Sequence, residues 1–518
     1  MRFNKTAKGK SKTVNHEGDK AYKLSPEMNL YSTVCTASLQ PKFYEKQDET
    51  LERIRELIKK CKPEFVAKLA IYAREKMYLR SVPIVLAVEL AKQHNKDSVV
   101  SKTTERVIQR ADELVEIMAY YQTTQQLDVK VESKKKLAKL SKQISKGVAN
   151  AFNKFNEYQF GKYNRPSEIK LRDVLFLTHP KPKDKEQEKL FKKIIDDKLE
   201  VPYTWEVELS NIGQKHFETE EEKQAAFMSK WEELIDSKKL GYMALLRNLR
   251  NILNINVSKK HIINIAKTLS DKENVKKSKQ LPFRFLSAYK ELQKNDNPLT
   301  NMILDALEEA ILVSTENIKG YDYDTSVLIA CDVSSSMNQS ISAKSKIENY
   351  DIGLTLGMLL QNKCKSVITG VFGDEWKNVQ LPKKSILQNI QELGKLNSEV
   401  GWSTNGWKVL EYLIEKKIKV DKIMIFTDCQ MWNSDISTNE SNDCSELSMF
   451  HKLWKDYKKI NIEAKMYLFD LSGCGTTPLF VDERDVYLIA GWSDKIFDVL
   501  EGIDNGESAL NEINKIAF

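Results

Sequence analysis

The sequence lacks the features that mark membrane proteins, disulfide-bonded secreted proteins and several common classes of hydrolase. No uninterrupted apolar run approaches the roughly 18 residues of a membrane span, and residues 1–20 are polar and lysine-rich without the apolar centre of a secretory signal. The 7 cysteines are scattered and form no Cys-x-x-Cys pair, so neither a disulfide framework nor a zinc knuckle is expected. P-loop, His-Glu-x-x-His and Gly-x-Ser-x-Gly patterns are also absent. We therefore expect a cytoplasmic protein without a membrane partner.

Charge is distributed unevenly along the 518 residues. Residues 321–518 carry 21 Lys and Arg against 29 Asp and Glu, whereas residues 1–320 carry 60 against 44. The net charge of +8 therefore hides a balance of +16 in the first part and −8 in the second. A basic part joined to an acidic part indicates a polyanionic partner for the first part alone. The length suffices for about two to four domains.

Apolar strands and amphipathic helices alternate from residue 326 onward. Strands are predicted at residues 326–331, 366–372, 422–427, 464–469 and 486–490, with helices between most of them. Strands that are apolar throughout and separated by helices indicate a mostly parallel sheet covered on both faces, which is a doubly wound, Rossmann-like α/β domain. Ligands of such sheets bind at the carboxyl ends of the strands.

Oxygen-bearing side chains lie at those strand ends and in a neighbouring loop, and we expect them to form a metal site. The candidate ligands are Asp332, Ser334, Ser336, Thr404 and Asp428. Mg²⁺ takes near-octahedral oxygen ligands and keeps several waters, so hydroxyls with one or two carboxylates suit it or another divalent cation. The alternative is that Asp332 and the serines only cap the helix that follows.

The Asp-x-Ser-x-Ser…Thr…Asp pattern resembles the metal-ion-dependent adhesion site of von Willebrand factor A domains, over roughly the last two-fifths of the chain, residues 321–518. The resemblance implies that the serines and the threonine contact the metal through hydroxyls, while the aspartates bind it directly or through water. A partner's carboxylate commonly completes the shell in that family. Trp402 and Ser403 stand where the family often has glycines, so we expect a stiffer loop.

Residues 21–320 are predicted to form one helix after another, without a convincing strand period. Apolar stripes at residues 51–58 and 66–77 are separated by Pro63, and short helices follow in pairs. This pairing resembles a HEAT-like helical-repeat solenoid, although the sequence has no clean period. Residues 1–20 are expected to be a basic, flexible tail.

The strongest concentration of positive charge lies at residues 134–146. One face of the helix predicted there is apolar, and another carries Lys135, Lys139, Lys142 and Lys146, so the helix would present a lysine ridge suited to phosphates. Downstream, basic and aromatic side chains mix in the way that holds single-stranded nucleic acid by charge and stacking: Tyr158, Phe160, Lys162, Tyr163, Arg165 and His179. The alternative is a solvated lysine face beside aromatics and a histidine that belong to the core.

Four segments resemble the TROVE domain of the Ro autoantigen family, in its prokaryotic or phage branch: KAYKLSP (20–26), LRDVLFLTHPK (171–181), GYMALLRNLRNI (241–252) and LPFRFLSAY (281–289). The resemblance implies that residues 21–320 close into a monomeric ring that binds RNA. A single-stranded 3′ end of a misfolded or structured noncoding RNA would enter the ring, and small Y or Y-like RNAs would bind its basic outer surface. The family's RNA contacts fall on Lys162, His179 and Arg165, the last displaced by one place.

The resemblance predicts a non-enzymatic RNA-binding protein of RNA quality control, with a basic ring and a Mg²⁺-binding A domain. A 3′-to-5′ exoribonuclease such as polynucleotide phosphorylase is a candidate partner by resemblance only, and no DNA partner is expected. Two alternatives stay open. One is a protein-interaction scaffold whose A domain captures a partner's carboxylate, and the other is a Mg²⁺-dependent hydrolase. The second is disfavoured because Ser334 stands where such phosphatases place a second aspartate.

Overall fold

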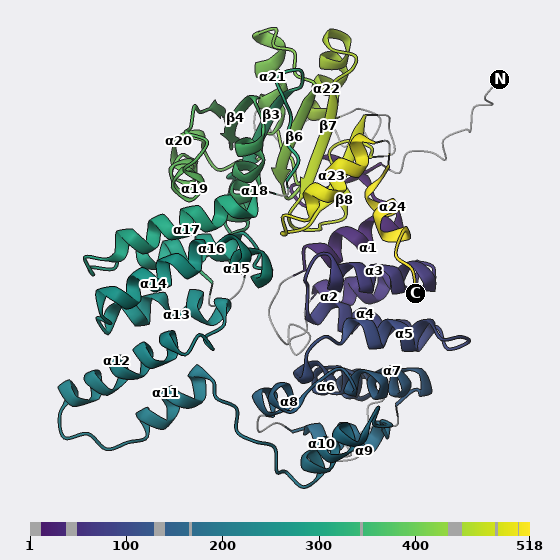
Figure 1. Cartoon of the computed structure of the whole chain (residues 1–518). Helices are drawn as coiled ribbons and strands as arrows, with labels where there is room; N and C mark the ends of the chain where they lie inside the picture. Colours follow the sequence, from purple (N-terminus) through teal and green to yellow (C-terminus); the bar gives the residue numbers. More distant parts are fainter. Residues whose placement is uncertain are drawn as a thin grey trace. The chain divides into compact units, whose positions relative to one another are not determined.

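The computed structural model describes residues 12–37, 49–128, 140–164, 168–316, 318–341, 345–433, 448–481, 485–505 and 507–518 (Figure 1). The chain divides into two compact units. The helical unit comprises Leu39–Leu240 and Asn511–Phe518, and the sheet unit comprises Met1–Ser38 and Gly241–Leu510. Within the described ranges, none of the helices has both the length and the apolar character needed to cross a membrane.

The helical unit is an array of short helices, as the repeat pattern predicts. In it, α3 packs on α4 and α5, α5 packs on α7, and α6 packs on α8 and α9 (Figure 1). The bounds are α2 (Glu49–Ile58), α3 (Pro63–Glu75), α4 (Ser81–Gln93), α5 (Val99–Val107), α6 (Ala111–Asp128), α7 (Lys142–Phe152), α8 (Glu157–Tyr163), α9 (Leu171–Thr178), α10 (Lys185–Ile195), α11 (Trp205–Gly213) and α12 (Glu220–Asp236).

Local sequence explains where several of these helices begin. Pro63 is the first residue of α3, where its missing N–H and fixed φ suit a helix start. The hydroxyl of Ser141 accepts a hydrogen bond of 3.2 Å from the N–H of Ile144 and so caps α7 at Lys142. One lysine-rich helix was expected over residues 134–146, but Leu140 and Ser141 are not helical and α7 begins only at Lys142, so a single helix over this range is wrong. The segment from 129 to 139 lies outside the described residues.

The helices α13 to α17 of the sheet unit directly precede its sheet in the sequence, and they continue the helical pattern. Here α13 packs on α16, and α17 packs on both α14 and α16. They are α13 (Tyr242–Asn254), α14 (Lys259–Ser270), α15 (Lys272–Ser278), α16 (Phe283–Leu292) and α17 (Thr300–Ser314). A helical-repeat region therefore runs in sequence into an α/β domain.

The sheet of this α/β domain has the strand order β5-β4-β3-β6-β7-β9, parallel except for β5. Because the chain leaves β3 toward β4 and later returns to β6 on its other side, the carboxyl end of β3 is a topological switch point. The strands are β3 (Ser326–Asp332), β4 (Ser366–Phe372), β5 (Trp376–Asn378), β6 (Lys422–Thr427), β7 (Lys465–Asp470) and β9 (Val486–Ala490).

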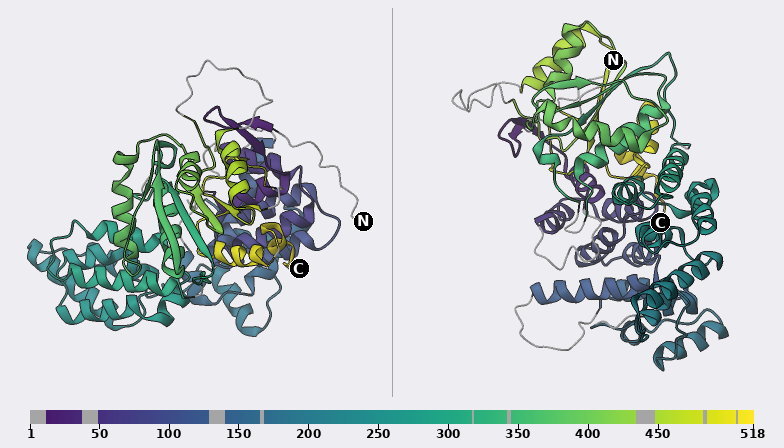
Figure 2. Two further views of the ribbon diagram at one scale, coloured as in Figure 1. Left: turned by 90° about the horizontal axis from the view of Figure 1, so that it is seen from above. Right: turned by 90° about the vertical axis from the view of Figure 1, so that its left-hand side faces the viewer.

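Helices cover both faces of this sheet, as predicted for a doubly wound domain (Figures 1 and 2). Leu328 and Ala330 of β3 face the cluster built by α21 and α22, whereas Ile329 and Cys331 face Gly357 of α18. A Cβ at Gly357 would lie 2.8 Å from the Cys331 sulfur, so only glycine lets α18 approach this closely. The helices that follow β3 in the sequence are α18 (Asn349–Lys363), α19 (Ile386–Lys395), α20 (Asn397–Val400), α21 (Trp407–Glu415), α22 (Met449–Ile460), α23 (Ile496–Asp504) and α24 (Ala509–Asn514).

The beginning of the chain packs on the α/β domain, which the sequence analysis did not predict. β1 (Lys12–Val14) pairs with β2 (Lys20–Lys23), and β2 pairs with β8 (Thr476–Thr477) of the domain. The expectation that residues 1–20 form a flexible tail is therefore wrong for residues 12–20, which form a strand and a turn. The expectation that residues 21–320 contain no strand is wrong as well, because most of β2 lies there. These strands are too short for a detectable period, and their partner lies more than 400 residues away.

Two tyrosines and a serine anchor this beginning further. The hydroxyl of Tyr31, in α1 (Pro26–Cys35), donates to the carbonyl of Ala490 at 3.2 Å and accepts from its N–H at 3.1 Å. Ser32 donates to the carboxylate of Asp470 at the end of β7, and the Tyr22 hydroxyl lies 2.8 Å from Nδ1 of His451. Because all these groups are buried, the beginning of the chain belongs to the core of the sheet unit.

Candidate functional site

The loop that leaves β3 holds three of the predicted metal ligands close together. Asp332 is 1% exposed, and its Oδ1 accepts a hydrogen bond of 3.0 Å from the N–H of Ser334. Its Oδ2 accepts from the hydroxyl of Thr427 at 2.6 Å. The hydroxyls of Ser334 and Ser336 are 3.2 Å apart. The carboxylate and the two hydroxyls therefore form one compact set of oxygens at the switch point of the sheet.

Asp428, which follows β6, joins the same set. Its side chain is buried, its Oδ1 accepts from the N–H of Gln430 at 2.9 Å, and the Ser336 hydroxyl is near enough to act on the pKa of its carboxyl, which it lowers. Two carboxylates from neighbouring strands thus meet around the serine hydroxyls. Thr427, which orients Asp332, was not among the predicted residues, although its place one residue before Asp428 is a usable signal.

Thr404 lies in a loop that is tied to both carboxylate-bearing loops. Its carbonyl accepts from the N–H of Trp432 at 3.0 Å, and the carbonyl of Trp402 accepts from the N–H of Ser335 at 2.9 Å. Thr404 itself is 4% exposed. The backbone bonds hold the threonine loop next to the Ser334–Ser336 loop, so the five predicted ligands come from three loops that are joined to one another.

Asp374 shapes the threonine loop, a role that the sequence analysis did not predict. Its carboxylate accepts hydrogen bonds from the N–H groups of Trp402 at 3.3 Å and Ser403 at 3.0 Å. Gly401 has a φ of +82°, and a Cβ there would collide with the Asp374 carboxylate. The Trp402 side chain is 47% exposed. Trp402 and Ser403 therefore replace the expected glycines without filling the site, because Gly401 supplies the turn and Asp374 fixes it.

The electrostatics of this oxygen set favour a cation. Burial raises the pKa of Asp332, and the nearby carboxylate of Asp428 raises it further. Burial also raises the pKa of Asp428. Two buried carboxylates at short range are costly unless a positive charge is shared between them, and no Lys, Arg or His among the described residues forms an ion pair with either. Asp332, Ser334, Ser336, Thr404 and Asp428 thus fit a hard divalent cation.

No group of three or more His, Cys, Asp or Glu side chains with metal-binding geometry occurs in the part of the chain that the structure describes. A cation at the end of β3 would therefore depend on hydroxyls and water as much as on carboxylates. This is the ligand balance that suits Mg²⁺, which keeps several of its waters, and it does not suit Zn²⁺, which prefers nitrogen and sulfur.

The turn between β1 and β2 lies beside this site. Asn15 donates its side-chain N–H to the carbonyl of Met431 at 2.7 Å, and the N–H of His16 donates to Oε1 of Gln430 at 2.9 Å. Glu17 is close enough for its charge to add to the rise in the pKa of Asp428, after burial and Asp470. An acidic residue from the beginning of the chain thus increases the negative potential around the oxygen set.

The predicted lysine ridge is described only in its second half. Lys142 and Lys146 are exposed on α7, while Ile144 and Val148, on the other face of the helix, are fully buried. The two faces therefore separate as the 3.6-residue period predicts. Lys135 and Lys139 lie outside the described residues, and so does Arg165.

Lys162 stands at the end of α8 in a basic and aromatic group. Its Nζ lies 5.7 Å from the centre of the Tyr163 ring, and the guanidinium of Arg110 lies over the same ring at 4.5 Å. Lys162 also lines a cavity of about 560 Å³ together with Asn164, Glu200 and other residues. Arg110 is already paired with Asp112 at 2.8 Å, so Lys162 is the cation beside this half-buried ring that has no ion pair among the described residues. A lysine beside an aromatic ring is suited to a phosphate next to a base.

His179 and Phe160, two further residues of the predicted RNA-binding surface, differ in their exposure to solvent. His179 ends α9 with a φ of +46°, and its side chain is exposed, so it is not a core histidine. Because α8 and α9 both pack on α6, they belong to the same part of the helical unit. Phe160 is fully buried and packs against Phe152 and Phe155, so the expectation that it stacks on a base is wrong. Its ring fills the core because the helical period turns it inward.

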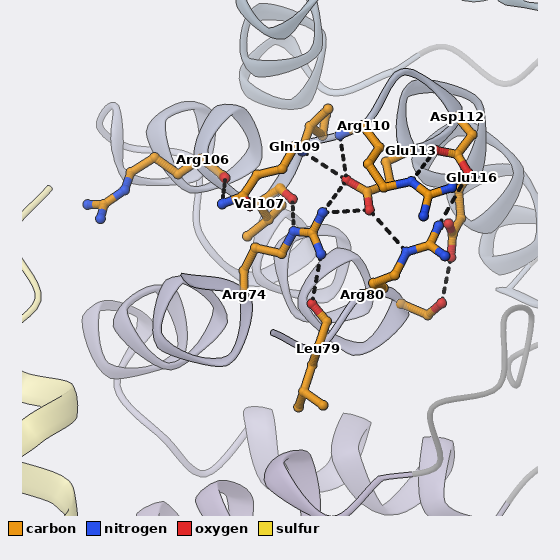
Figure 3. A network of polar contacts seen from close by, with 12 residues as sticks. Arg74, Leu79, Arg80, Arg106, Val107, Gln109, Arg110, Asp112, Glu113 and Glu116 are labelled. Carbon is orange, nitrogen blue, oxygen red and sulfur yellow. Dashed lines mark hydrogen bonds and ion pairs between the residues drawn. The ribbon is translucent and has the colours of Figure 1, made fainter. Parts of the chain in front are cut away.

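A buried ion network supports this surface (Figure 3). The Glu113 carboxylate is fully buried and accepts two hydrogen bonds, of 2.7 and 2.8 Å, from Nη2 of Arg74. It also accepts from the backbone N–H groups of Gln109 at 2.8 Å and Arg110 at 3.0 Å. α5 ends at Val107, and these bonds hold the backbone of Gln109 and Arg110 that follows it. The guanidinium of Arg110 reaches Tyr163.

We expect Glu113→Ala to destabilise the helical unit by about 3–5 kcal/mol, because Arg74 would be left as a buried, unpaired charge. Urea unfolding followed by circular dichroism measures this loss. Glu56→Ala is the matched control, because Glu56 forms only an exposed pair with Lys59 and its loss should leave the unfolding midpoint nearly unchanged. Equal unfolding midpoints for the two variants would show that the buried network stabilises the helical unit no more than an exposed ion pair does.

Comparisons with known proteins agree with the order of the two folds. The model of the TROVE domain family matches residues 24–224 and 197–350, and the model of the Ro60 von Willebrand factor A domain matches residues 326–501. Together the TROVE matches cover more than half of the chain.

Two curated relatives are similar over parts of the chain. Telomerase protein component 1 of Rattus norvegicus is 25% identical over an alignment of 351 residues, and the match covers 52% of this chain and 13% of the rat protein. Telomerase protein component 1 of Mus musculus is 42% identical over 97 residues, which is 19% of this chain and 3% of the mouse protein. The chain thus spans only a small part of these relatives.

A solved structure resembles nearly the whole chain. The Ro (Rsr) protein of Deinococcus radiodurans superposes with a TM-score of 0.58 over 93% of this chain and 100% of that chain, at 16% sequence identity. At this level of identity the likeness establishes the fold alone. It agrees with a helical-repeat region followed by an α/β domain.

Proposed function

Because the chain belongs to the TROVE domain family and carries a Ro60-type von Willebrand factor A domain, we propose that it is a non-enzymatic RNA-binding protein. The observation that carries the proposal is the group formed by Lys162, Tyr163 and Arg110, with the exposed His179 on a helix that packs on the same α6. The exposed lysines of α7 extend the positive charge. Charge combined with aromatic faces suits single-stranded RNA.

The finer part of the proposal follows the family. We propose that residues 21–320 form a monomeric ring, that a misfolded or structured noncoding RNA places a single-stranded 3′ end in it, and that Y or Y-like RNA binds its outer surface. The role would be RNA quality control, in cooperation with a 3′-to-5′ exoribonuclease such as polynucleotide phosphorylase. The prokaryotic or phage-type assignment rests on the four segments quoted above. The free thiols of the described cysteines suit a reducing compartment, so we propose the cytoplasm.

Lys162→Ala combined with His179→Ala should weaken binding of RNAs with single-stranded 3′ ends by about tenfold or more, because hydrogen bonds to charged groups are lost. Gel-shift titration of a hairpin RNA with and without a 3′ overhang measures the effect, and circular dichroism checks folding.

The matched control is Lys59→Ala combined with His94→Ala, in which each cation already has an acidic neighbour, Glu56 and Asp97. This control should bind like the unmodified protein. If the Lys162 and His179 variant also binds the overhang RNA with unchanged affinity, RNA does not bind at this surface.

Salt should weaken RNA binding steeply. Phosphate contacts release counterions, so raising salt from about 50 to about 200 mM should lower the affinity by about 10³-fold if roughly six phosphates are contacted. Fluorescence anisotropy at several salt concentrations gives the slope. A nearly flat response would argue against the +16 charge of residues 1–320 as the source of affinity.

We also propose that Asp332, Ser334, Ser336, Thr404 and Asp428 hold Mg²⁺ or another divalent cation. When bound, the ion would offer an open position to a carboxylate. The support is the pair of buried carboxylates among three hydroxyls, with both pKa values raised by burial. In the chain's own contacts, Thr427 orients Asp332 and Asp374 orients the loop of Thr404.

Asp332→Asn should lower the affinity for Mg²⁺ by more than the roughly tenfold loss that outer-shell substitutions cause. Titration calorimetry with MgCl₂, and Mn²⁺ as a spectroscopic probe, measures this affinity. Asp324→Asn, which removes an exposed carboxylate just before β3, is the control and should bind the ion normally. The metal assignment fails if both variants bind Mg²⁺ equally well.

The two alternatives make different predictions for labelled RNA incubated with the protein and Mg²⁺. Shifted, intact RNA supports RNA binding, and cleaved RNA supports a hydrolase. RNA that is neither shifted nor cleaved supports the protein-interaction scaffold. The hydrolase has little support, because Ser334 stands two residues after Asp332 and donates its N–H to that carboxylate. The scaffold is compatible with RNA binding, since a partner's carboxylate would use the metal site and RNA the helical unit.

A further inference from the structure

A positively charged cavity lies between α13 and α16, in the sheet unit. It has a volume of about 420 Å³, and its lining includes Arg247, Arg250, Arg284, Ser287 and Glu291. The segments that bring these residues together, 241–252 and 281–289, were singled out in the sequence for their family resemblance, but no chemical role was assigned to them. Their packing supplies one, because it places three guanidinium groups around one cavity.

The arginines differ in how their charges are balanced. Arg250 forms an ion pair of 2.8 Å with Glu291, whose carboxylate also pairs with Lys346 at 2.7 Å. The carboxylate of the lining is therefore already shared between two cations. Arg247 and Arg284 form no ion pair within the described residues. The cavity thus carries positive charge that the protein itself does not neutralise.

Arg284 is the more constrained of the two unpaired arginines. Burial lowers the pKa of its guanidinium, and the charge of Arg247 lowers it further, so the two groups repel each other at short range. The guanidinium lies over the ring of Phe283 at 5.1 Å, and that ring is buried against Trp492. An arginine is thus held in place beside a like charge without a counter-charge, which is costly unless a ligand brings a negative one.

The chemistry of the cavity indicates the kind of ligand. Guanidinium groups are planar, remain charged and bind phosphate oxygens through paired hydrogen bonds. Ser287 lies about one helical turn after Arg284 and adds a hydroxyl to the lining. A cavity of about 420 Å³ is within the range of small-ligand sites, roughly 300–1,000 Å³. A phosphate group would fit the cavity and relieve the repulsion between the arginines.

We propose that Arg247 and Arg284 form a phosphate-binding pocket, and that the phosphate is one of the backbone groups of the bound RNA. The second clause rests on the proposed function, whereas the pocket itself does not. This pocket is in the sheet unit and is separate from the surface around Lys162, which is in the helical unit. The chain would therefore contact RNA through both units.

The pocket is tested first with inorganic phosphate on the full chain. Phosphate should raise the melting temperature of the unmodified protein relative to chloride at the same ionic strength, because a ligand that binds only the folded state stabilises it. Arg247→Gln combined with Arg284→Gln should abolish this shift. Lys395→Gln should keep it, since Lys395 is exposed, paired with Glu392 and outside the lining of the cavity. No shift in the unmodified protein, or the same shift in all three proteins, would overturn the pocket.

RNA binding is tested separately by anisotropy of a labelled oligouridylate. The double variant should bind about tenfold or more weakly, and the slope of log affinity against log salt should fall by about one per lost phosphate contact. Arg284→Lys, which keeps the charge but not the paired geometry, should recover part of the loss.

The outcomes separate this pocket from the proposed function. If the unmodified protein binds no RNA, the proposed function fails, and the phosphate shift alone decides the pocket. If phosphate gives the expected shift but the double variant binds RNA with unchanged affinity, the pocket serves a small phosphate-bearing ligand, and its assignment to RNA is overturned.

Discussion

The cost of burying a charge without an opposite charge is the constraint that best explains this structure. Where the chain supplies both charges, as in Glu113 with Arg74, the pair lies in the core and holds the backbone between α5 and α6. Where the described residues supply one sign only, at Asp332 and Asp428 or at Arg247 and Arg284, we propose that a bound ion supplies the other. The same rule thus distinguishes buried ion pairs, which stabilise the fold, from candidate ligand sites.

The two incomplete sites have opposite signs, and both are in the sheet unit. The proposed ligand of the oxygen set at the end of β3 is a cation, and the proposed ligand of the arginines between α13 and α16 is an anion. Each is built from elements that the fold brings together for other reasons. The switch point of the sheet gathers the carboxylates, and the packing of two amphipathic helices gathers the arginines. Each site therefore rests on rigid elements.

Much of the fold could be predicted because its local patterns agree with its packing. The bounds of β4, β6 and β9 were predicted from continuous apolar runs, since buried parallel strands are apolar on both faces. β5, β8 and the β1–β2 pair were missed, because short edge strands leave no such pattern. Asp332, Ser334, Ser336 and Asp428 could be placed in one set because all follow strands of one sheet. Asp374 could not, because its role is to accept backbone hydrogen bonds from a loop 28 and 29 residues further along.

The sequence by itself determined the order of folds, the placement of oxygen ligands at strand ends and the separation of a basic part from an acidic part. These follow from the spacing of residue types along the chain, which the periods of helix and strand convert directly into faces and edges. Only the tertiary structure decided which charges are paired, that Phe160 is buried, and that Asn15 meets Met431. Such contacts join residues far apart in the chain, and their energy depends on burial and distance, which no local pattern records.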